Sequence, residues 1–80
     1  MAKVRLFASA RDAAGTGTDV IEAATVADVL EVARGRYSDR FADVLTTCRI
    51  WVNGEDAGLD TAVGPDDEVA VLPPVSGGAT

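Results

Sequence analysis

Residues 25–37 of this 80-residue chain read Thr-Val-Ala-Asp-Val-Leu-Glu-Val-Ala-Arg-Gly-Arg-Tyr, and this stretch decides the fold because it is the one long helix that the sequence predicts. Thr25 can cap the first turn, and the Asp28 carboxylate lies near the positive end of the helix dipole. Apolar residues then recur at intervals of three and four. We therefore expect a helix from Val26 to about Tyr37 with one apolar face.

Strands are predicted on both sides of this helix. Alternation of apolar and polar residues, and turn residues between the runs, mark each of them. A short helical turn before Gly15 separates the first two, and Asn53-Gly54 is typical of the tight turn of a hairpin. A second, shorter helix is a candidate over residues 38–45. The predicted strands cover residues 3–8, 18–23, 49–52, about 55–57 and 68–72.

This order of elements favours an α+β fold, a mixed sheet of four to five strands with one main helix packed on one face. The first and last strands can lie side by side in parallel, because a long helix-containing crossover connects the two halves. That is the ubiquitin-like β-grasp arrangement. We expect residues 1–72 to form this domain and residues 73–80 to be a flexible C-terminal tail.

Composition narrows the class of function. Thirteen acidic residues against seven basic ones give a net charge of -6, which disfavours nucleic acid as a partner. Cys48 is the only cysteine and the chain has no histidine, so neither an internal disulfide nor a cysteine-based zinc site is expected. No apolar run approaches membrane-spanning length, and the N-terminus lacks the apolar core of a signal peptide. A cytoplasmic protein with no bound metal or cofactor fits best.

Three large apolar residues form a candidate partner surface. Alternation places Phe7, Trp51 and Leu72 opposite the core residues of their strands, so all three should face away from the helix. If the first, last and third strands are neighbours, these side chains make one exposed apolar row, and such clusters often mark interfaces. Scattered surface apolar residues are the ordinary alternative. Arg5 and Arg49 share this face and could pair with acids of a partner.

The chain ends in Pro73-Pro74-Val75-Ser76-Gly77-Gly78-Ala79-Thr80. Two consecutive glycines can thread through a channel too narrow for other residues and allow a partner to approach the backbone closely. The tail therefore suggests that its backbone, or a terminal glycine carboxylate, is the working group. The plain alternative is a frayed end, which small residues at a terminus commonly form.

Four motifs, in this order and spacing, resemble the MoaD/ThiS family of ubiquitin-like sulfur carriers, and most closely its molybdopterin synthase small subunits. The resemblance covers nearly the whole chain. The motifs are Phe7-Ala8-x-x-Arg11-Asp12-x-x-Gly15, Val52-Asn53-Gly54, Gly64-x-Asp66-Asp67-Glu68-Val69 and Pro73-Pro74-Val75-Ser76-Gly77-Gly78.

This resemblance implies a non-catalytic carrier subunit. A ubiquitin-activating-like (MoeB-like) enzyme would use ATP to adenylate the Gly78 carboxylate, and a sulfur nucleophile would convert it to a thiocarboxylate. The tail, with Gly77, Pro73, Pro74 and Val75, would then enter the large subunit of molybdopterin synthase (MoaE-like), where sulfur passes to cyclic pyranopterin monophosphate. The mixed anhydride with AMP supplies the leaving group that a free carboxylate lacks.

Ala79 and Thr80 depart from the family pattern, because an amide-linked Gly78 has no carboxylate to activate. Three explanations stay open: trimming by a protease, a remnant outside the native protein, or a carrier-shaped protein that is not activated. Two rival functions also stay open. One is a sulfur carrier for thiazole, cysteine or another thiolated product, and the other is a ubiquitin-like interaction module without sulfur chemistry.

Overall fold

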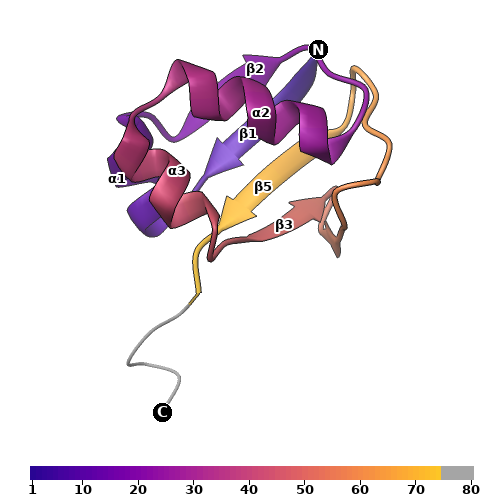
Figure 1. Cartoon of the computed structure of the whole chain (residues 1–80). Helices are drawn as coiled ribbons and strands as arrows, with labels where there is room; N and C mark the ends of the chain where they lie inside the picture. Colours follow the sequence, from indigo (N-terminus) through magenta and orange to yellow (C-terminus); the bar gives the residue numbers. More distant parts are fainter. Residues whose placement is uncertain (75–80) are drawn as a thin grey trace.

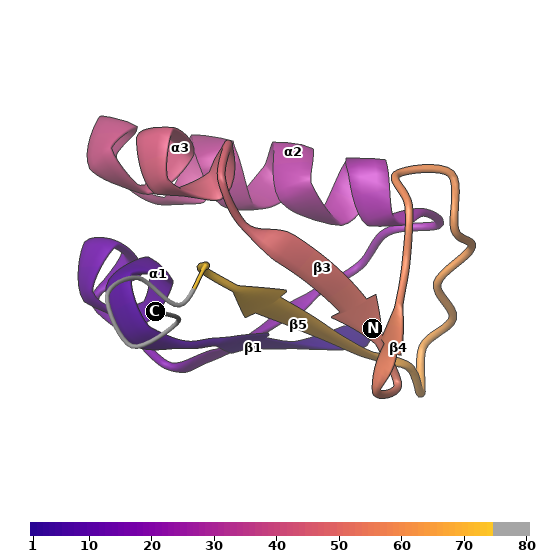
Figure 2. The same cartoon turned by 90° about the horizontal axis from the view of Figure 1, so that it is seen from below.

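One mixed sheet and three helices build the protein, and the computed structural model describes residues 1–74 of it (Figure 1). In chain order the elements are β1 (Ala2–Leu6), α1 (Ala8–Ala14), β2 (Thr18–Ile21), α2 (Val26–Arg36), α3 (Asp39–Leu45), β3 (Arg49–Val52), β4 (Glu55–Asp56) and β5 (Glu68–Leu72). Figure 2 shows α2 and α3 lying together on one side of the sheet.

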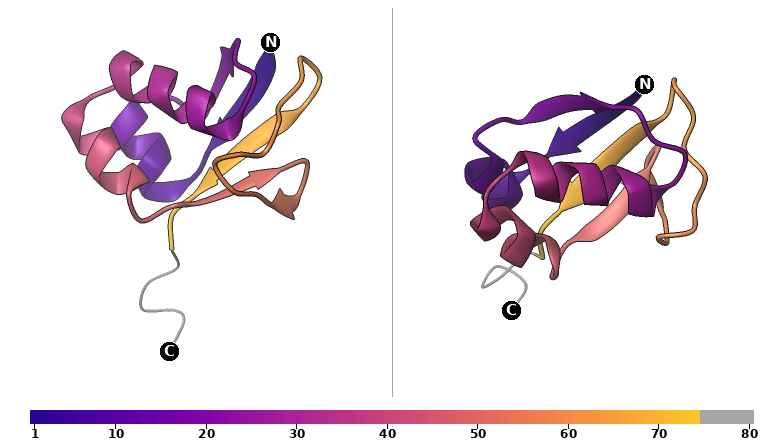
Figure 3. Two further views of the ribbon diagram at one scale, coloured as in Figure 1. Left: turned by 45° about the vertical axis from the view of Figure 1, so that its right-hand side comes forward. Right: turned by 45° about the horizontal axis from the view of Figure 1, so that its top comes forward.

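The strand order is β2-β1-β5-β3-β4, which places the last strand at the centre of the sheet. β1 and β5 are parallel, with Val4 opposite Val69, and the other neighbouring pairs are antiparallel. The predicted parallel pairing of the first and last strands and the β-grasp arrangement are therefore confirmed. Both views of Figure 3 show β5 between β1 and β3.

The predicted main helix is also confirmed. Thr25 Oγ1 accepts a hydrogen bond from the Asp28 N–H at 3.2 Å, and Tyr37 is the C-cap residue. The shorter predicted helix is confirmed as well. It is α3, which begins after Ser38, and the Ser38 side chain accepts a hydrogen bond from the Phe41 N–H. The apolar faces of the helices and the inward residues of the strands meet in one core. Its largest fully buried side chains are Phe41, Leu6, Ile21, Val4, Val26, Val29, Val69 and Val71.

Two strand ends differ from the prediction. β1 stops at Leu6 and not at residue 8, because Ala8 adopts a φ of 49°, which turns the chain from the extended Phe7 into α1. β2 stops at Ile21 and not at residue 23, because Ile21 pairs with Ala2 and β1 offers no residue further along. Both ends are thus fixed by neighbouring segments and not by the local alternation.

Candidate functional site

The C-terminal tail begins at the carboxyl end of β5, in the middle of the sheet. Leu72, the last residue of β5, lies opposite Arg49 of β3. On the other side, Leu6 pairs with Val71, and the Phe7 N–H donates to the Val71 carbonyl at 3.3 Å. Pro73 follows half-buried and Pro74 exposed. The chain therefore leaves the domain between the ends of two flanking strands, β1 and β3.

The sheet face opposite α2 carries the predicted partner residues, and we refer to it as the open face. Inward residues such as Val4, Ile50 and Val71 are buried. The residues between them point the other way, because side chains alternate along a strand. The open face is defined here by Arg5, Phe7, Arg49, Trp51, Ala70 and Leu72.

The three large apolar residues share this face but do not make a single row. The register puts Phe7 beside Leu72 at the tail end of the sheet. Trp51 instead pairs with Ala70, which precedes Leu72 by two residues in β5. Arg5 of β1 pairs with Ala70 from the other side. The surface is a two-row patch in which the partly buried Leu72 and Ala70 link the exposed rings of Phe7 and Trp51.

Both arginines of the open face already have acidic neighbours in the chain. Arg5 Nη1 lies 3.7 Å from Glu68 Oε2, and its guanidinium carbon lies 5.9 Å from the centre of the Phe7 ring. Arg49 Nη1 lies 3.5 Å from Asp56 Oδ2. All four side chains are largely exposed, and such pairs contribute little to stability. A partner carboxylate could therefore replace either internal acid at small cost.

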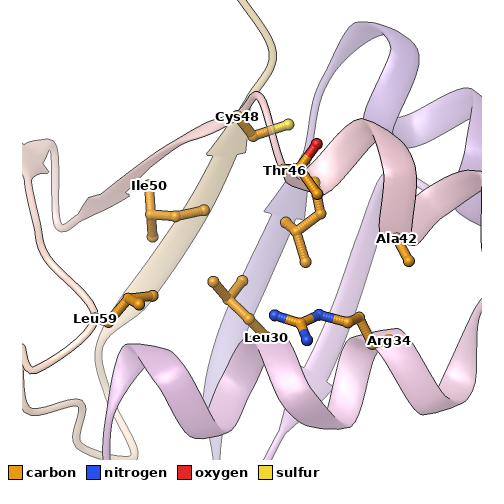
Figure 4. Close-up of a pocket in the computed structure, with 8 residues that line it drawn as sticks. Leu30, Arg34, Ala42, Thr46, Cys48, Ile50 and Leu59 are labelled. Atoms are coloured by element: carbon orange, nitrogen blue, oxygen red, sulfur yellow. The ribbon is translucent and has the colours of Figure 1, made fainter.

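A separate hollow of about 230 Å³ lies on the helix side, between α2, α3 and β3 (Figure 4). It is lined by Leu30, Arg34, Ala42, Leu45, Thr46, Cys48, Ile50 and Leu59. Cys48 is the nucleophile of this set, but none of the other lining residues is a carboxylate that could act as a base. Burial raises the pKa of the Cys48 thiol, and its Sγ donates to the Val44 carbonyl at 3.2 Å. Cys48 thus packs against the core as a small space-filling residue.

Sequence reasoning missed a polar cluster that joins the end of α2 to β2. Arg36 Nη1 lies 2.8 Å from both carboxylate oxygens of Asp19, and the Tyr37 hydroxyl donates to Asp19 Oδ2. Burial would raise the pKa of the Asp19 carboxyl, but the hydrogen bonds from Tyr37 and Arg36 outweigh it and hold that pKa below its ordinary value. Burial, together with the bond to Asp19, raises the pKa of Tyr37 to about 12. No local pattern links residues that far apart in sequence.

The predicted working group of the tail lies beyond the described part of the chain. Val75, Gly77, Gly78 and the Ala79-Thr80 extension fall outside residues 1–74. Within those residues, no group of three or more acidic, cysteine or histidine side chains is placed to hold a metal ion. The helices of the same part are all too short or too polar to cross a membrane.

Comparison with known proteins gives one family match. The model of the ThiS family matches residues 4–78. The chain is 38% identical over 84 residues to small archaeal modifier protein 1 of Haloferax volcanii, a match that covers 92% of this chain and 97% of the relative. It is also 35% identical over 85 residues to the molybdopterin synthase sulfur carrier subunit of Mycosarcoma maydis, covering 95% and 91% of the two chains.

Solved structures agree with the observed topology. The solution structure of small archaeal modifier protein 1 from Methanosarcina acetivorans superimposes with a TM-score of 0.84 and is 31% identical in sequence. That match covers 95% of this chain and 94% of the solved one. The putative molybdopterin converting factor, subunit 1, of Pyrococcus furiosus superimposes with a TM-score of 0.82 and is 30% identical, over 92% of this chain and 97% of the solved one. Relatives named for the two roles therefore share one fold.

Proposed function

We propose that this chain, which belongs to the ThiS family, is the sulfur carrier of a molybdopterin synthase and works through a thiocarboxylate on Gly78. Sulfur carriers and ubiquitin-like modifiers are both represented among its relatives. The observation that carries the proposal is the extent of the family match, which runs through the tail and ends at Gly78, before Ala79 and Thr80. The match thus includes Gly77 and stops at Gly78.

The domain supports this role by what it places around the tail. β5 ends in the middle of the sheet, so Leu72, Phe7 and Arg49 lie beside the point from which the tail leaves. A partner that binds the open face would therefore receive the tail at its own surface. Exposed aromatic rings such as Trp51 and Phe7 are suited to anchor that partner.

The chemistry then divides between this chain and its partners. The Gly78 carboxylate attacks the α-phosphorus of ATP and pyrophosphate leaves, which gives an acyl adenylate on an activating enzyme. Sulfide next attacks the carbonyl carbon and AMP leaves, which gives the thiocarboxylate. In the large synthase subunit this sulfur passes to cyclic pyranopterin monophosphate. In this proposal the cytoplasm is the place of reaction, and trimming by a protease frees the Gly78 carboxylate.

One observation favours a second candidate function. The relative with 38% identity is named a modifier protein, and attachment to other proteins needs the same activated glycine. The two roles differ in the group that attacks the acyl adenylate, a sulfur nucleophile for the carrier and an amine for the modifier. Sulfur carriers for thiazole or cysteine synthesis differ from the main proposal only in the final acceptor.

A reconstitution separates these functions. The chain ending at Gly78 is mixed with an adenylating enzyme, ATP and sulfide, and intact mass is measured before and after a molybdopterin synthase large subunit and precursor are added. We expect the mass gain of one sulfur replacing one oxygen, followed by its loss as molybdopterin forms. The chain ending at Thr80 is the matched control and should gain nothing. No gain by the Gly78 chain would overturn the sulfur role, and a gain without molybdopterin would favour another carrier pathway.

A further inference from the structure

β2 is an edge strand of the sheet, so a further strand could pair with it if its outward backbone groups were free. Edge strands present unpaired N–H and C=O groups that another chain can bind. The Leu6 N–H donates to the Gly17 carbonyl at 2.9 Å, and this register continues along β1 and β2. In an antiparallel pair, hydrogen-bonded and non-hydrogen-bonded positions alternate. The backbone groups of Thr18 and Val20 therefore point outward, away from β1.

The Thr16 side chain forms hydrogen bonds with both outward backbone groups of Thr18, its N–H and its carbonyl. Its hydroxyl Oγ1 accepts from the Thr18 N–H at 3.3 Å and donates to the Thr18 carbonyl at 2.9 Å. A hydroxyl can do both at once, because it carries one donor and two acceptor lone pairs. An incoming strand would have to break this pair of bonds before it could bond to Thr18.

The outward N–H and carbonyl of Val20 form hydrogen bonds with two different side chains. Asp19 Oδ1 accepts from the Val20 N–H at 2.7 Å, and Arg36 Nη1 donates to the Val20 carbonyl at 3.3 Å. Arg36 is itself held in place by the Asp19 carboxylate, which also accepts from the Tyr37 hydroxyl. The end of α2 is thus fastened along the strand edge by charge-assisted hydrogen bonds, which are stronger than neutral ones.

The other edge of the sheet gives an added strand little to pair with. β4 has only two residues, Glu55 and Asp56, and both are exposed acids. Very short edge strands and charged side chains are the ordinary means by which proteins discourage strand addition. The two edges are therefore protected by different means, one by length and charge and one by a side-chain cap.

We propose that Thr16, Asp19 and Arg36 form a cap that closes the β2 edge to strand addition. The inference does not depend on the proposed sulfur chemistry, because a carrier and a modifier would present the same edge. It excludes one class of partner, an extended peptide that pairs with β2.

Removal of the cap tests the proposal, with a second copy of the chain as the strand donor. The double variant Thr16→Val with Arg36→Ala frees both outward groups of Thr18 and the Val20 carbonyl. The matched control is Thr47→Val with Arg34→Ala, since the Thr47 hydroxyl donates to the Val44 carbonyl and Arg34 pairs with Glu31 of its own helix. Sedimentation over a concentration series should show an apparent dimer dissociation constant at least tenfold lower for the double variant than for the wild type or the control. A folded double variant that associates no more than the wild type would overturn the proposal.

Hydrogen exchange of backbone amides in the wild-type protein is a second test of the cap, and it does not require the double variant to fold. We expect the Thr18 and Val20 amides to exchange at least tenfold more slowly than the same amides in the unfolded chain, although they lie outside the β1 pairing. Exchange of both amides at the unprotected rate would mean that no cap exists in solution, whatever the variants do.

Discussion

Trp51 leaves 38% of its surface exposed in the middle of a strand, although its neighbours Ile50 and Val52 point into or toward the core. We expect Trp51→Ala to weaken binding to a synthase large subunit on the order of thirtyfold, or about 2 kcal/mol, because aromatic anchors dominate interface energies. Titration calorimetry on the two proteins measures this. The free energy of unfolding of the isolated chain should fall by about 1 kcal/mol, because part of the ring packs on the sheet, and the variant should remain folded.

Val32 provides the control, because it is also 38% exposed but lies on α2, on the opposite side of the sheet. Val32→Ala should leave the binding constant unchanged. Equal losses from Trp51→Ala and Val32→Ala would show that the open face is not the binding surface.

Asn53 ties the β3–β4 turn to the start of β5. It adopts a φ of 53°, its side-chain amide donates to Asp67 Oδ1 at 2.9 Å, and its Oδ1 accepts from the Glu68 N–H at 2.9 Å. Asn53→Ala should lower the free energy of unfolding by about 2 kcal/mol, because it loses both side-chain hydrogen bonds and leaves at a positive φ a residue without the local side-chain bonding that lets Asn adopt it. Urea unfolding measures the change.

Asn53→Gly separates the two causes. Glycine accepts the positive φ but has no side chain to bond Asp67 or Glu68, so its loss should be about 1 kcal/mol smaller than that of alanine. Equal losses in the two variants would mean that backbone conformation contributes nothing at this turn.

At the scale of elements, the junction of α2 and β2 makes stability depend on pH. The pKa of Asp19 is lower in the folded chain than its ordinary value of 3.8, so its ionised form stabilises the fold above that pH. This contribution is lost as pH falls through the folded pKa. The raised pKa of Tyr37, about 12 against 10.0, has the opposite sign: its contribution is complete below pH 10 and lost as pH rises through 12.

Asp19→Asn should therefore flatten the acid side of the stability curve. Between about pH 5 and pH 2, its free energy of unfolding should fall less than that of the wild type, because the variant has no carboxylate to protonate. Urea unfolding at a series of pH values checks this, with Asp12→Asn on α1 as the control. An acid slope that is the same in the wild type and in Asp19→Asn would contradict the assignment.

Elements with a strong local pattern could be predicted, and so could the parallel pairing of the first and last strands. The side-chain contacts between elements could not. The Thr25 cap, the apolar stripe of α2 and the Asn53-Gly54 turn are local signals, and each marks the element that the structure contains. The two-row arrangement of the open face depends on the register of β3 against β5, which no local pattern carries. The same holds for the Arg36–Asp19 pair, because its members come from different elements.

At the scale of the whole molecule, Figure 2 shows α2 on one side of the sheet. The core lies between this helix and the sheet, and the residues of the candidate partner surface alternate with the core residues and point to the opposite side. The last strand lies in the centre, so the chain leaves the domain beside both Phe7 and Arg49. The tail motif itself could be recognised from sequence, because it consists of consecutive residues. Its position relative to the open face required the topology, since β5 reaches the centre only through its pairing with β1 and β3.

The central claim is that Gly78 carries the reactive carbonyl, and the intact mass of the protein isolated from its own host tests it most directly. We expect a chain that ends at Gly78, with a fraction in which sulfur replaces one carboxylate oxygen. A stable and fully active chain that still carries Ala79 and Thr80 would contradict the account, because its Gly78 carbonyl would remain locked in an amide bond.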